Sequence, residues 1–404
     1  MDSGSLISRR GILGMVGAAG AAAALSACGS SLGGGSAGGE SGGGVKVGLL
    51  IPQAGVYTPL GVDMQRGWDL WLKQHGGKLG GMPVTTVVAD EGESPQTGVP
   101  ALQRLIQSDN VDVVVGIVSS STALGVRDMV TESKKVLMVA NAGANDITAA
   151  AASPYIWRTS FTNSQVAAAM GEYLAKENPQ DSVFLIASDY AAGDEAMAGF
   201  KEAFEAGGGK IAGMAKPPFG ETQDYQPFLA KIKSSGAKAT FCFFAGSEAV
   251  TFVKQYRQFG LAKSVPLYGS GFLTEGGVLD AQGDAALGVQ TSLHYTSELD
   301  NPANQAFRES YEKAYDAVPT VYSVQSWDAA NTLDRALRES GSAEGDALSK
   351  ALGQLGEIDD SPRGPWQFEG QTPKQAFYLR KVVEEDGTLV NSVVAETDPV
   401  GQTS

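Results

Sequence analysis

The sequence predicts an α/β fold with two doubly wound parallel-sheet lobes. Short apolar runs alternate with longer amphipathic stretches from residue 45 onward, which is typical of βαβ units whose parallel sheet carries helices on both faces. The alternation occurs in two series, which are separated near Trp157-Arg158-Thr159-Ser160. Each series is long enough for its own sheet. Two such lobes leave a cleft between their loop edges, where ligands of open α/β folds bind.

The expected elements follow the same alternation in both series. In the first series, strands are expected at Val45–Ile51, Val84–Ala89, Val111–Val115 and Val136–Ala140, and helices at Val62–Gln74, Thr97–Ser108 and Thr122–Ser133. In the second, strands are expected at Val183–Ala187, Lys210–Ala215, Thr240–Phe244 and Val265–Tyr268, and helices at Asp194–Glu205, Tyr225–Ser234 and Glu248–Gln258. After Gly288–His294 we expect helices at Pro302–Ala317 and Ser323–Glu339, then strands at Trp366–Phe368, Phe377–Val383 and Thr388–Val393.

Residues 1–27 have the pattern of a signal peptide rather than of folded structure. Arg9 and Arg10 precede an apolar run, Gly11 to Leu25, that is too short and too rich in Gly and Ala to span a bilayer. The arginine pair resembles a twin-arginine signal, and a plain Sec signal is the alternative. The run ends in Leu25-Ser26-Ala27-Cys28, which resembles the lipobox of bacterial lipoproteins. That resemblance implies lipidation of Cys28.

Residues 28–44 are expected to form the lipidated cysteine and a flexible tether. The stretch 29–44 holds nine Gly and four Ser, a composition that cannot bury enough apolar surface to fold. We therefore expect an exported protein that a lipid anchors to the outer face of the cell membrane. If Cys28 is lipidated, only Cys242 remains, and its apolar surroundings predict a buried strand residue.

Composition argues against several functions. The formal net charge of -15 disfavours nucleic acid as a partner. Two histidines, His75 and His294, and two cysteines are too few for a zinc cluster. Neither a G-x-S-x-G nucleophile motif nor a phosphate-binding loop occurs. We expect no catalysis, no cofactor and no metal, although acidic residues are abundant enough to leave a carboxylate-pair enzyme open.

One loop has the composition of an anion-binding site. Gly116-Ile117-Val118-Ser119-Ser120-Ser121-Thr122 leaves an expected strand and opens an expected helix. The free backbone N–H groups at such a helix start, together with hydroxyl groups, can bind a carboxylate or another small anion. The alternative is that one of these serines only caps the helix.

An ordered set of motifs resembles the type I periplasmic solute-binding proteins of the branched-chain amino acid (Leu/Ile/Val-binding) ABC-transporter family. The set comprises Val47–Pro52, Gly61, Gly67, Gly80–Pro83, Val115-Gly116 with Ser119–Thr122, Trp157–Ser160, Ser188-Asp189-Tyr190 with Gly193, Val253–Tyr256 and Ser326–Ala330. The resemblance covers roughly residues 45–395. It implies a three-crossover hinge between lobe 1 (45–160 plus 295–355) and lobe 2 (161–294 plus 356–395), with a tail at 396–404.

The resemblance also implies site residues. Ser119 and Ser120, with the backbone at Ala142, Gly143 and Ala144, would bind the ligand carboxylate. Lobe 2 would then close over the ligand with Tyr190, Gly246 and Phe272. Arg158 can pair the anion, although the family position favours a structural ion pair. The closed form would dock as a monomer on a membrane permease, with ATP hydrolysis on a separate ATPase subunit.

Two departures from the family pattern bear on the ligand. Ala144 lacks the threonine hydroxyl that the family often has there, and Gly271 stands where amino-acid binders carry the glutamate that pairs the ligand ammonium. Glu248 or Glu275 would have to substitute. We therefore favour an aromatic or other organic carboxylate, with flat walls from Tyr57, Tyr190, Phe244 and Phe272. A branched-chain or other amino acid or amide receptor, and a ligand sensor for a membrane partner, are the alternatives.

Overall fold

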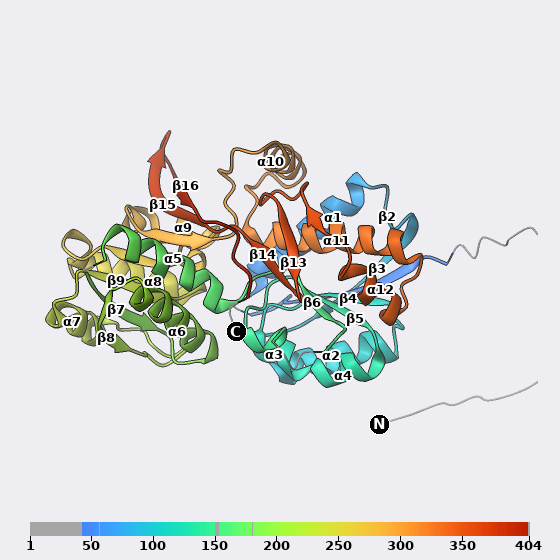
Figure 1. Ribbon diagram of the computed structural model, residues 1–404, viewed down its shortest axis with the longest axis horizontal. Coiled ribbons are helices and arrows are strands. Elements are labelled where there is room, and N and C mark those ends of the chain that lie inside the picture. Colours follow the sequence, from blue (N-terminus) through green and yellow to red (C-terminus); the bar gives the residue numbers. More distant parts are fainter. Residues whose placement is uncertain (1–42, 56, 150–152, 180, 403–404) are drawn as a thin grey trace, which may run out of the picture. The chain divides into compact units, whose positions relative to one another are not determined.

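The first lobe is built on a six-stranded sheet with the order β2-β3-β1-β4-β5-β6 (Figure 1). The computed structural model describes residues 43–402 except 56, 150–152 and 180, so the expected signal peptide, Cys28 and most of the tether lie outside the described residues. The sheet is parallel except for the β2–β3 hairpin. Its strands are β1 (Val45–Ile51), β2 (Lys78–Leu79), β3 (Met82–Asp90), β4 (Val113–Gly116), β5 (Val136–Val139) and β6 (Ile156–Arg158).

The second lobe is built on a seven-stranded sheet with the order β16-β15-β11-β10-β9-β7-β8. Strands β7 to β11 are parallel, and β15 and β16 add an antiparallel edge. The strands are β7 (Ser182–Ala187), β8 (Lys210–Ala215), β9 (Ala239–Phe243), β10 (Leu267–Ser270), β11 (Gln290–Leu293), β15 (Tyr378–Glu385) and β16 (Thr388–Glu396).

Helices cover both faces of each sheet, as the continuous burial of the central strands requires. In β4, Val113 and Val115 pack toward α1 and α11, whereas Val114 packs toward α2. The first lobe carries α1 (Thr58–Gln74), α2 (Pro95–Gln107), α3 (Ser120–Gly125), α4 (Arg127–Ser133), α10 (Pro302–Tyr315), α11 (Val321–Ser340) and α12 (Gly345–Leu352). The second carries α5 (Asn163–Glu177), α6 (Ala191–Ala206), α7 (Gln226–Ser235), α8 (Gly246–Gln258) and α9 (Gly277–Gln282).

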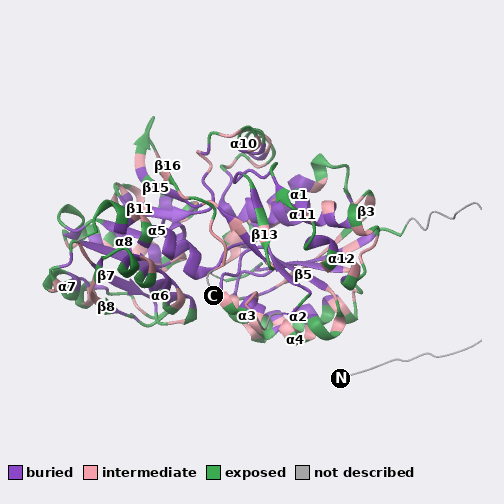
Figure 2. Ribbon diagram, viewed as in Figure 1, coloured by how far each residue is buried: buried purple, intermediate pink, exposed green. Residues whose placement is uncertain are grey.

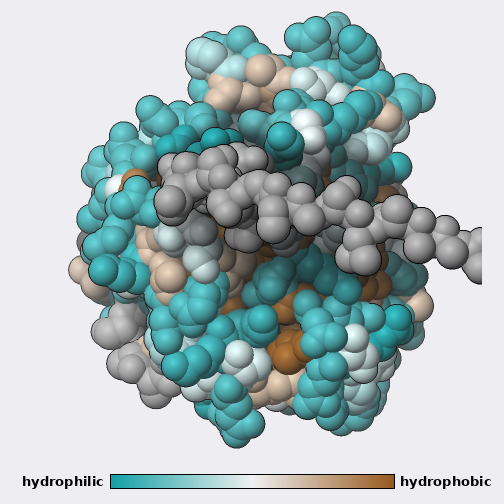
Figure 3. Space-filling view, turned by 90° about the vertical axis from the view of Figure 1, so that its right-hand side faces the viewer, coloured by the Kyte–Doolittle hydropathy of each residue, from teal (hydrophilic) through white to brown (hydrophobic). Residues whose placement is uncertain are grey.

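The core of each lobe lies between its sheet and the helices that cover it. Figure 2 shows buried strands inside a shell of helices whose outer faces are exposed. The side of the molecule seen in Figure 3 is predominantly hydrophilic, in keeping with a chain of net charge -15. No helix in the described part of the chain is long and apolar enough to cross a membrane.

The chain passes three times between the two sheets, which confirms the predicted three-crossover α/β fold. The first passage, 159–162, joins β6 to α5. The second, 294–301, joins β11 to α10, and it contains His294. The third, 376–377, joins the small sheet β12 (Glu357–Ile358), β13 (Trp366–Glu369) and β14 (Thr372–Gln375) to β15. This small sheet adjoins the first lobe, where the Arg158 N–H donates to the Gln371 carbonyl at 3.1 Å.

A buried arginine connects the first passage with the end of β14, directly before the third passage. The Nη1 atom of Arg363 donates to the Thr159 carbonyl at 2.8 Å and to Gln375 Oε1 at 2.7 Å. Its Nε atom forms an ion pair with Asp328 Oδ2 at 3.0 Å, and both side chains are almost completely buried. Asp328 belongs to α11, so the Arg363 guanidinium connects the first passage and the end of β14 to a first-lobe helix.

Several expected elements differ from the structure. The single helix expected at Thr122–Ser133 is wrong: α3 begins at Ser120, because Ser119 is its N-cap, and α4 begins separately at Arg127 after a break at Val126. Helix α5 was not predicted. Most of its residues are buried, so it lacks the apolar stripe and polar face that mark a surface helix in a sequence.

Close packing between α1 and α11 predicts a large effect of one methyl group. A Cβ atom at Gly67 would lie 2.0 Å from the Ser323 carbonyl oxygen, whereas a Cβ atom at Gly125 would make ordinary contacts at 3.5 Å. Gly67→Ala should therefore lower the free energy of unfolding by about 1–3 kcal/mol or more. Gly125→Ala should leave it within about 1 kcal/mol of the wild type. Urea unfolding measures both, and equal stabilities of the two variants would contradict the packing.

Candidate functional site

A cavity of about 590 Å³ opens between elements of the two lobes. From the first lobe it is lined by the start of α1 and the start of α11. From the second it is lined by loops that follow β7, β8, β9 and β10, at the carboxyl edge of that sheet. The lining residues are Tyr57, Pro59, Leu60, Asp63, Tyr190, Phe219, Gly220, Thr222, Gln223, Ala245–Glu248, Val250, Thr251, Glu275–Val278, Thr320 and Tyr322. This is the edge at which ligands of open α/β sheets bind.

Aromatic rings form much of the cavity wall. Tyr190 stacks on Phe219 with ring centroids 4.5 Å apart, and Tyr57 contributes a ring from the first lobe. Burial, helped by the charges of Glu91, Glu248 and Glu93, raises the pKa of Tyr57 to about 12. Burial also raises the pKa of Tyr190. Both phenols are therefore neutral at physiological pH and can donate hydrogen bonds.

The charged groups of the cavity wall are all acidic. Asp63, Glu248 and Glu275 line the cavity, and no Lys, Arg or His stands among the lining residues of the described chain. Asp63 accepts from Thr320 Oγ1 at 2.8 Å and lies 3.7 Å from the Arg66 guanidinium. The other two carboxylates have different partners among the described residues: Glu275 is paired with an arginine, whereas Glu248 accepts only from neutral donors.

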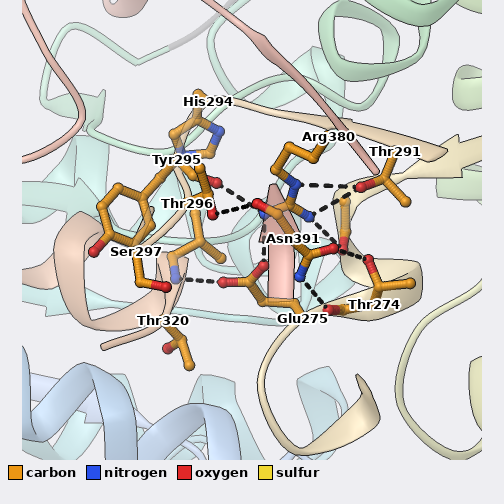
Figure 4. Close-up of polar contacts among 12 residues, drawn as sticks. Thr274, Glu275, Thr291, His294, Tyr295, Thr296, Ser297, Thr320, Arg380 and Asn391 are labelled. Atoms are coloured by element: carbon orange, nitrogen blue, oxygen red, sulfur yellow. Dashed lines mark hydrogen bonds and ion pairs between the residues drawn. The ribbon is translucent and has the colours of Figure 1, made fainter. Parts of the chain in front are cut away.

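The Glu275 carboxylate is neutralised within the chain. Figure 4 shows it between Arg380 and the start of α11. Arg380 Nη1 donates to Glu275 Oε2 at 2.9 Å and also to the Tyr295 carbonyl at 2.8 Å. The Val321 N–H donates to Glu275 Oε1 at 2.8 Å. This side chain therefore connects the second sheet with the first-lobe helix α11 instead of offering a free negative charge.

Arg380 also explains why position 271 is glycine. Its Nη2 atom donates to the Gly271 carbonyl at 3.0 Å. A Cβ atom at position 271 would lie 2.4 Å from Leu293 Cβ and 2.6 Å from Arg380 Nη2. Any side chain at this position, including a glutamate, would collide with both groups.

The predicted anion loop is partly occupied by a side chain of the protein itself. The N–H groups of Val118 and Ser119 donate to Glu91 Oε2 and Oε1 at 2.8 and 2.7 Å. Ser119 also serves as the N-cap of α3, since its Oγ accepts from the Thr122 N–H at 3.3 Å. Glu91 is fully buried. That burial raises its pKa to about 8 even though the two N–H groups favour the charged form.

Ser120 connects this loop to the loop that follows β5. Its Oγ accepts from the N–H groups of Gly143 and Ala144 at 3.2 and 3.1 Å, whereas the Ala142 N–H donates to the Ile117 carbonyl. Ser120 is only partly buried. Its hydroxyl proton is not used in these two bonds, so the group remains a donor for a ligand.

A buried guanidinium lies beneath this loop. Arg158 donates to the Ala144 carbonyl at 2.8 Å and to the Phe161 carbonyl. Within the described residues it has no carboxylate within 4.0 Å, so the expected structural ion pair is wrong. Burial lowers its pKa to about 9, and the charge of Glu195 opposes that shift. The positive charge of Arg158 is thus left without a close anion.

Comparison with known proteins identifies the family of this chain. A family model described as periplasmic binding protein matches residues 44–388.

The chain belongs to this family.

It is a type I periplasmic binding protein of the branched-chain amino acid ABC group, as the sequence predicted. Proteins of this family are exported, bind small molecules for ABC transporters and are not enzymes.

Three relatives show the range of the family. The Leu/Ile/Val-binding protein homolog 6 of Brucella melitensis is 31% identical over 365 residues, which cover 88% of this chain and 92% of that protein. An ABC-transporter solute-binding protein of R. palustris in complex with benzoate is 38% identical, with a TM-score of 0.79, and covers 89% of this chain and 98% of its own. Another from R. palustris, in complex with 4-hydroxybenzoate, is 31% identical, with a TM-score of 0.83, and covers 88% and 98%.

The structure brings only some of the predicted site residues to the cavity of this periplasmic binding protein. Tyr57, Tyr190 and Gly246 line it. Five other predicted residues do not line it but lie on two first-lobe loops that hydrogen bonds connect: Ser119 and Ser120 after β4, and Ala142, Gly143 and Ala144 after β5. Phe272 lies behind the wall, 4.8 Å from Phe161 and 6.3 Å from Tyr322 between ring centroids.

Other predictions about single residues have clear outcomes. Phe244 is not a cavity wall, because it is buried in the core against Phe252. Cys242 is a buried strand residue, as predicted. Phe219, Tyr322 and Asp63 line the cavity without having been predicted. Each lies near the start of a helix or in a loop after a strand, which is the only signal that the sequence offers for them.

The buried Glu91 predicts a specific pH dependence of stability. Its pKa is higher in the folded state, about 8 against an ordinary 4.5, so its contribution to stability is full below about pH 4.5 and is lost as the pH rises to about 8. Relative to Glu91→Gln, the free energy of unfolding of the wild type should fall across this window, by up to about 5 kcal/mol. Urea unfolding at several pH values measures the difference.

The exposed Glu132 of α4 provides the matched control for this experiment. Glu132→Gln should give a stability curve parallel to that of the wild type, because this glutamate is solvated in both states. Parallel curves for Glu91→Gln and the wild type would show that the buried carboxyl group titrates normally.

Proposed function

We propose that this protein is the substrate-binding component of an ABC importer and that it captures an aromatic carboxylate between its two lobes. The observations that carry the proposal are the aromatic-walled cavity and two first-lobe loops joined by Ser120, one of which contacts Arg158, a buried cation with no carboxylate within 4.0 Å among the described residues. Related solute-binding proteins of R. palustris hold benzoate and 4-hydroxybenzoate. A ring with a carboxylate matches both parts of this arrangement.

The carboxylate end of the ligand is assigned to two loops, the one that holds Ser119 and Ser120 and the one that holds Ala142, Gly143 and Ala144. Of the two serines, Ser120 is better placed, because Ser119 caps α3 and its N–H is bonded to Glu91. Ser120 already contacts the N–H groups of Gly143 and Ala144. A bound carboxylate would compensate the charge of Arg158 through the Ala144 peptide group, and charge-assisted hydrogen bonds of this kind are the stronger ones.

The ring of the ligand is assigned to the cavity between Tyr57 and Tyr190, with Gly246 on the second-lobe wall. Offset or edge-on contacts between aromatic rings contribute about 0.5–1.5 kcal/mol beyond area burial. Phe272 supports this wall from behind through Tyr322. Because the rings come from both lobes, a bound ligand favours the closed arrangement, as differential contact with two states requires.

We also propose how the protein reaches its partners. Residues 1–27 direct export, Cys28 carries the lipid anchor and residues 28–44 tether the monomeric binding lobes to the outer face of the membrane. The closed, ligand-bound form docks on a membrane permease whose ATPase subunits drive import. The sequence supports these assignments through the lipobox-like segment and the Gly- and Ser-rich stretch that follows it.

A second candidate ligand is a branched-chain or other amino acid or amide. Two glutamates that could pair an ammonium group, Glu248 and Glu275, do line the cavity, and a Brucella melitensis relative is named a Leu/Ile/Val-binding protein homolog. Against this candidate, Glu275 is paired with Arg380 and position 271 has no room for a glutamate.

A thermal-shift panel separates the two candidates, because a ligand stabilises the folded state by mass action. At concentrations about 100 times the Kd, benzoate or 4-hydroxybenzoate should add about 2.7 kcal/mol to the free energy of unfolding and raise the Tm. At the same concentrations, leucine, valine and short amides should raise the Tm less. A larger shift with the amino acids would replace the proposed ligand class.

Two serine variants locate the carboxylate within the same panel. Ser120→Ala should weaken benzoate binding by about 1–3 kcal/mol, since it removes a donor to a charged group. The neighbouring Ser121 is exposed, and Ser121→Ala is the matched control that should bind as the wild type does. Unchanged affinity of Ser120→Ala would remove this hydroxyl from the site.

A further inference from the structure

The cavity wall of the second lobe carries a carboxylate that forms no ion pair with any described residue. Glu248, in the first turn of α8, lines the cavity and is partly exposed there. Its Oε2 atom accepts from Ser188 Oγ at 2.8 Å, and its Oε1 atom accepts from the Gly220 N–H at 2.8 Å. None of the ion pairs found among the described residues includes Glu248. In this it differs from Glu275, which is paired with Arg380.

The two hydrogen bonds fix the Glu248 side chain without using all of its capacity. A carboxylate has about four lone-pair positions, and the two donors use one position on each oxygen. Each oxygen can therefore accept a further hydrogen bond from a group in the cavity. The side chain is held in place before any ligand arrives, which lowers the entropic cost of that bond.

Aromatic rings surround this acceptor. Tyr190 and Phe219 form a stacked pair on the same lobe. The negative charge of Glu248 contributes to the raised pKa of both Tyr57 and Tyr190. Glu91, which is bonded to the Val118 and Ser119 amides, also acts on Tyr57. Tyr57 from the first lobe and Glu248 from the second line the same cavity.

We infer that Glu248 determines specificity by accepting a hydrogen bond from a hydroxyl or amino group on the ligand ring, away from the ligand carboxylate, and by rejecting a second carboxylate. This inference rests on the proposed function. A ring O–H or N–H donates to the prepared carboxylate while the ring packs against Tyr190. A second carboxylate in the same place would face an uncompensated like charge with water partly excluded, and such juxtapositions discriminate strongly against wrong ligands.

Isothermal titration of the full-length chain with ring-substituted benzoates tests the inference. In the wild type, 4-hydroxybenzoate and 4-aminobenzoate should bind at least about 10-fold more tightly than 4-methoxybenzoate, which has similar size but no donor. Benzene-1,4-dicarboxylate should bind at least about 10-fold more weakly than benzoate. Equal affinities within each of these two comparisons would overturn the inference, although binding of the monocarboxylates would still support the proposed function.

Glu248→Gln assigns the effect to this side chain. The amide keeps one acceptor but loses the charge, so the preference for the hydroxyl compound should fall to less than about 3-fold and the penalty on the dicarboxylate should disappear. Glu221→Gln is the matched control, because Glu221 lies on the neighbouring loop but is exposed and does not line the cavity. Wild-type preferences that persist in Glu248→Gln would overturn the inference.

Amines without a carboxylate separate the inference from the proposed function. If no benzoate binds but 4-hydroxybenzylamine binds to the wild type and not to Glu248→Gln, the acceptor site stands and the proposed ligand class fails. If neither the acids nor the amine binds, both the acceptor site and the proposed ligand class are overturned. Circular dichroism and the Tm of each variant confirm that the compared proteins are folded.

Discussion

Two buried arginines hold the chain where it passes between the sheets, and the positions of the cleft walls depend on them. Arg363 bonds to the first passage at Thr159 and to Gln375, the last residue before the third passage. Arg380 bonds to the second passage at the Tyr295 carbonyl. Taking a guanidinium out of water costs several kcal/mol unless an acid and further acceptors compensate it. Asp328 and Glu275 supply that compensation, so each acid becomes part of the hinge framework.

The pairing of buried charges also determines which charged groups the cleft offers to a ligand. Glu275 lines the cavity and is paired with Arg380. Glu91 contacts the loop after β4 and Arg158 contacts the loop after β5, and neither has an ion-pair partner among the described residues. Burial raises the pKa of Glu91 and lowers that of Arg158, so burial favours the neutral form of each side chain. In the proposed site, the positive charge of Arg158 favours a bound anion, and Glu91 opposes it only above about pH 8, where its carboxyl group is ionised.

The sequence was sufficient for the two-lobed α/β fold, because strand and helix periodicities are local properties of the chain. It was insufficient for α5, which is buried on most sides and shows no polar face. Glu91 and Ser119 are 28 positions apart in the sequence, and no local sequence pattern predicts their contact. The absence of a glutamate at Gly271 was visible in the sequence, but its cause, the crowding by Leu293 and Arg380, required coordinates.

In the proposed complex, both lobes hold one small acid at the same time. Amide hydrogen exchange with and without saturating 4-hydroxybenzoate examines this, because protection reports local stability segment by segment. We expect slower exchange in the first-lobe segments Ser120–Thr122 and Gly143–Asn145 and also in the second-lobe segment Gly246–Glu248. Protection confined to one lobe, or no protection at saturating ligand, would show that the two lobes do not hold the acid together.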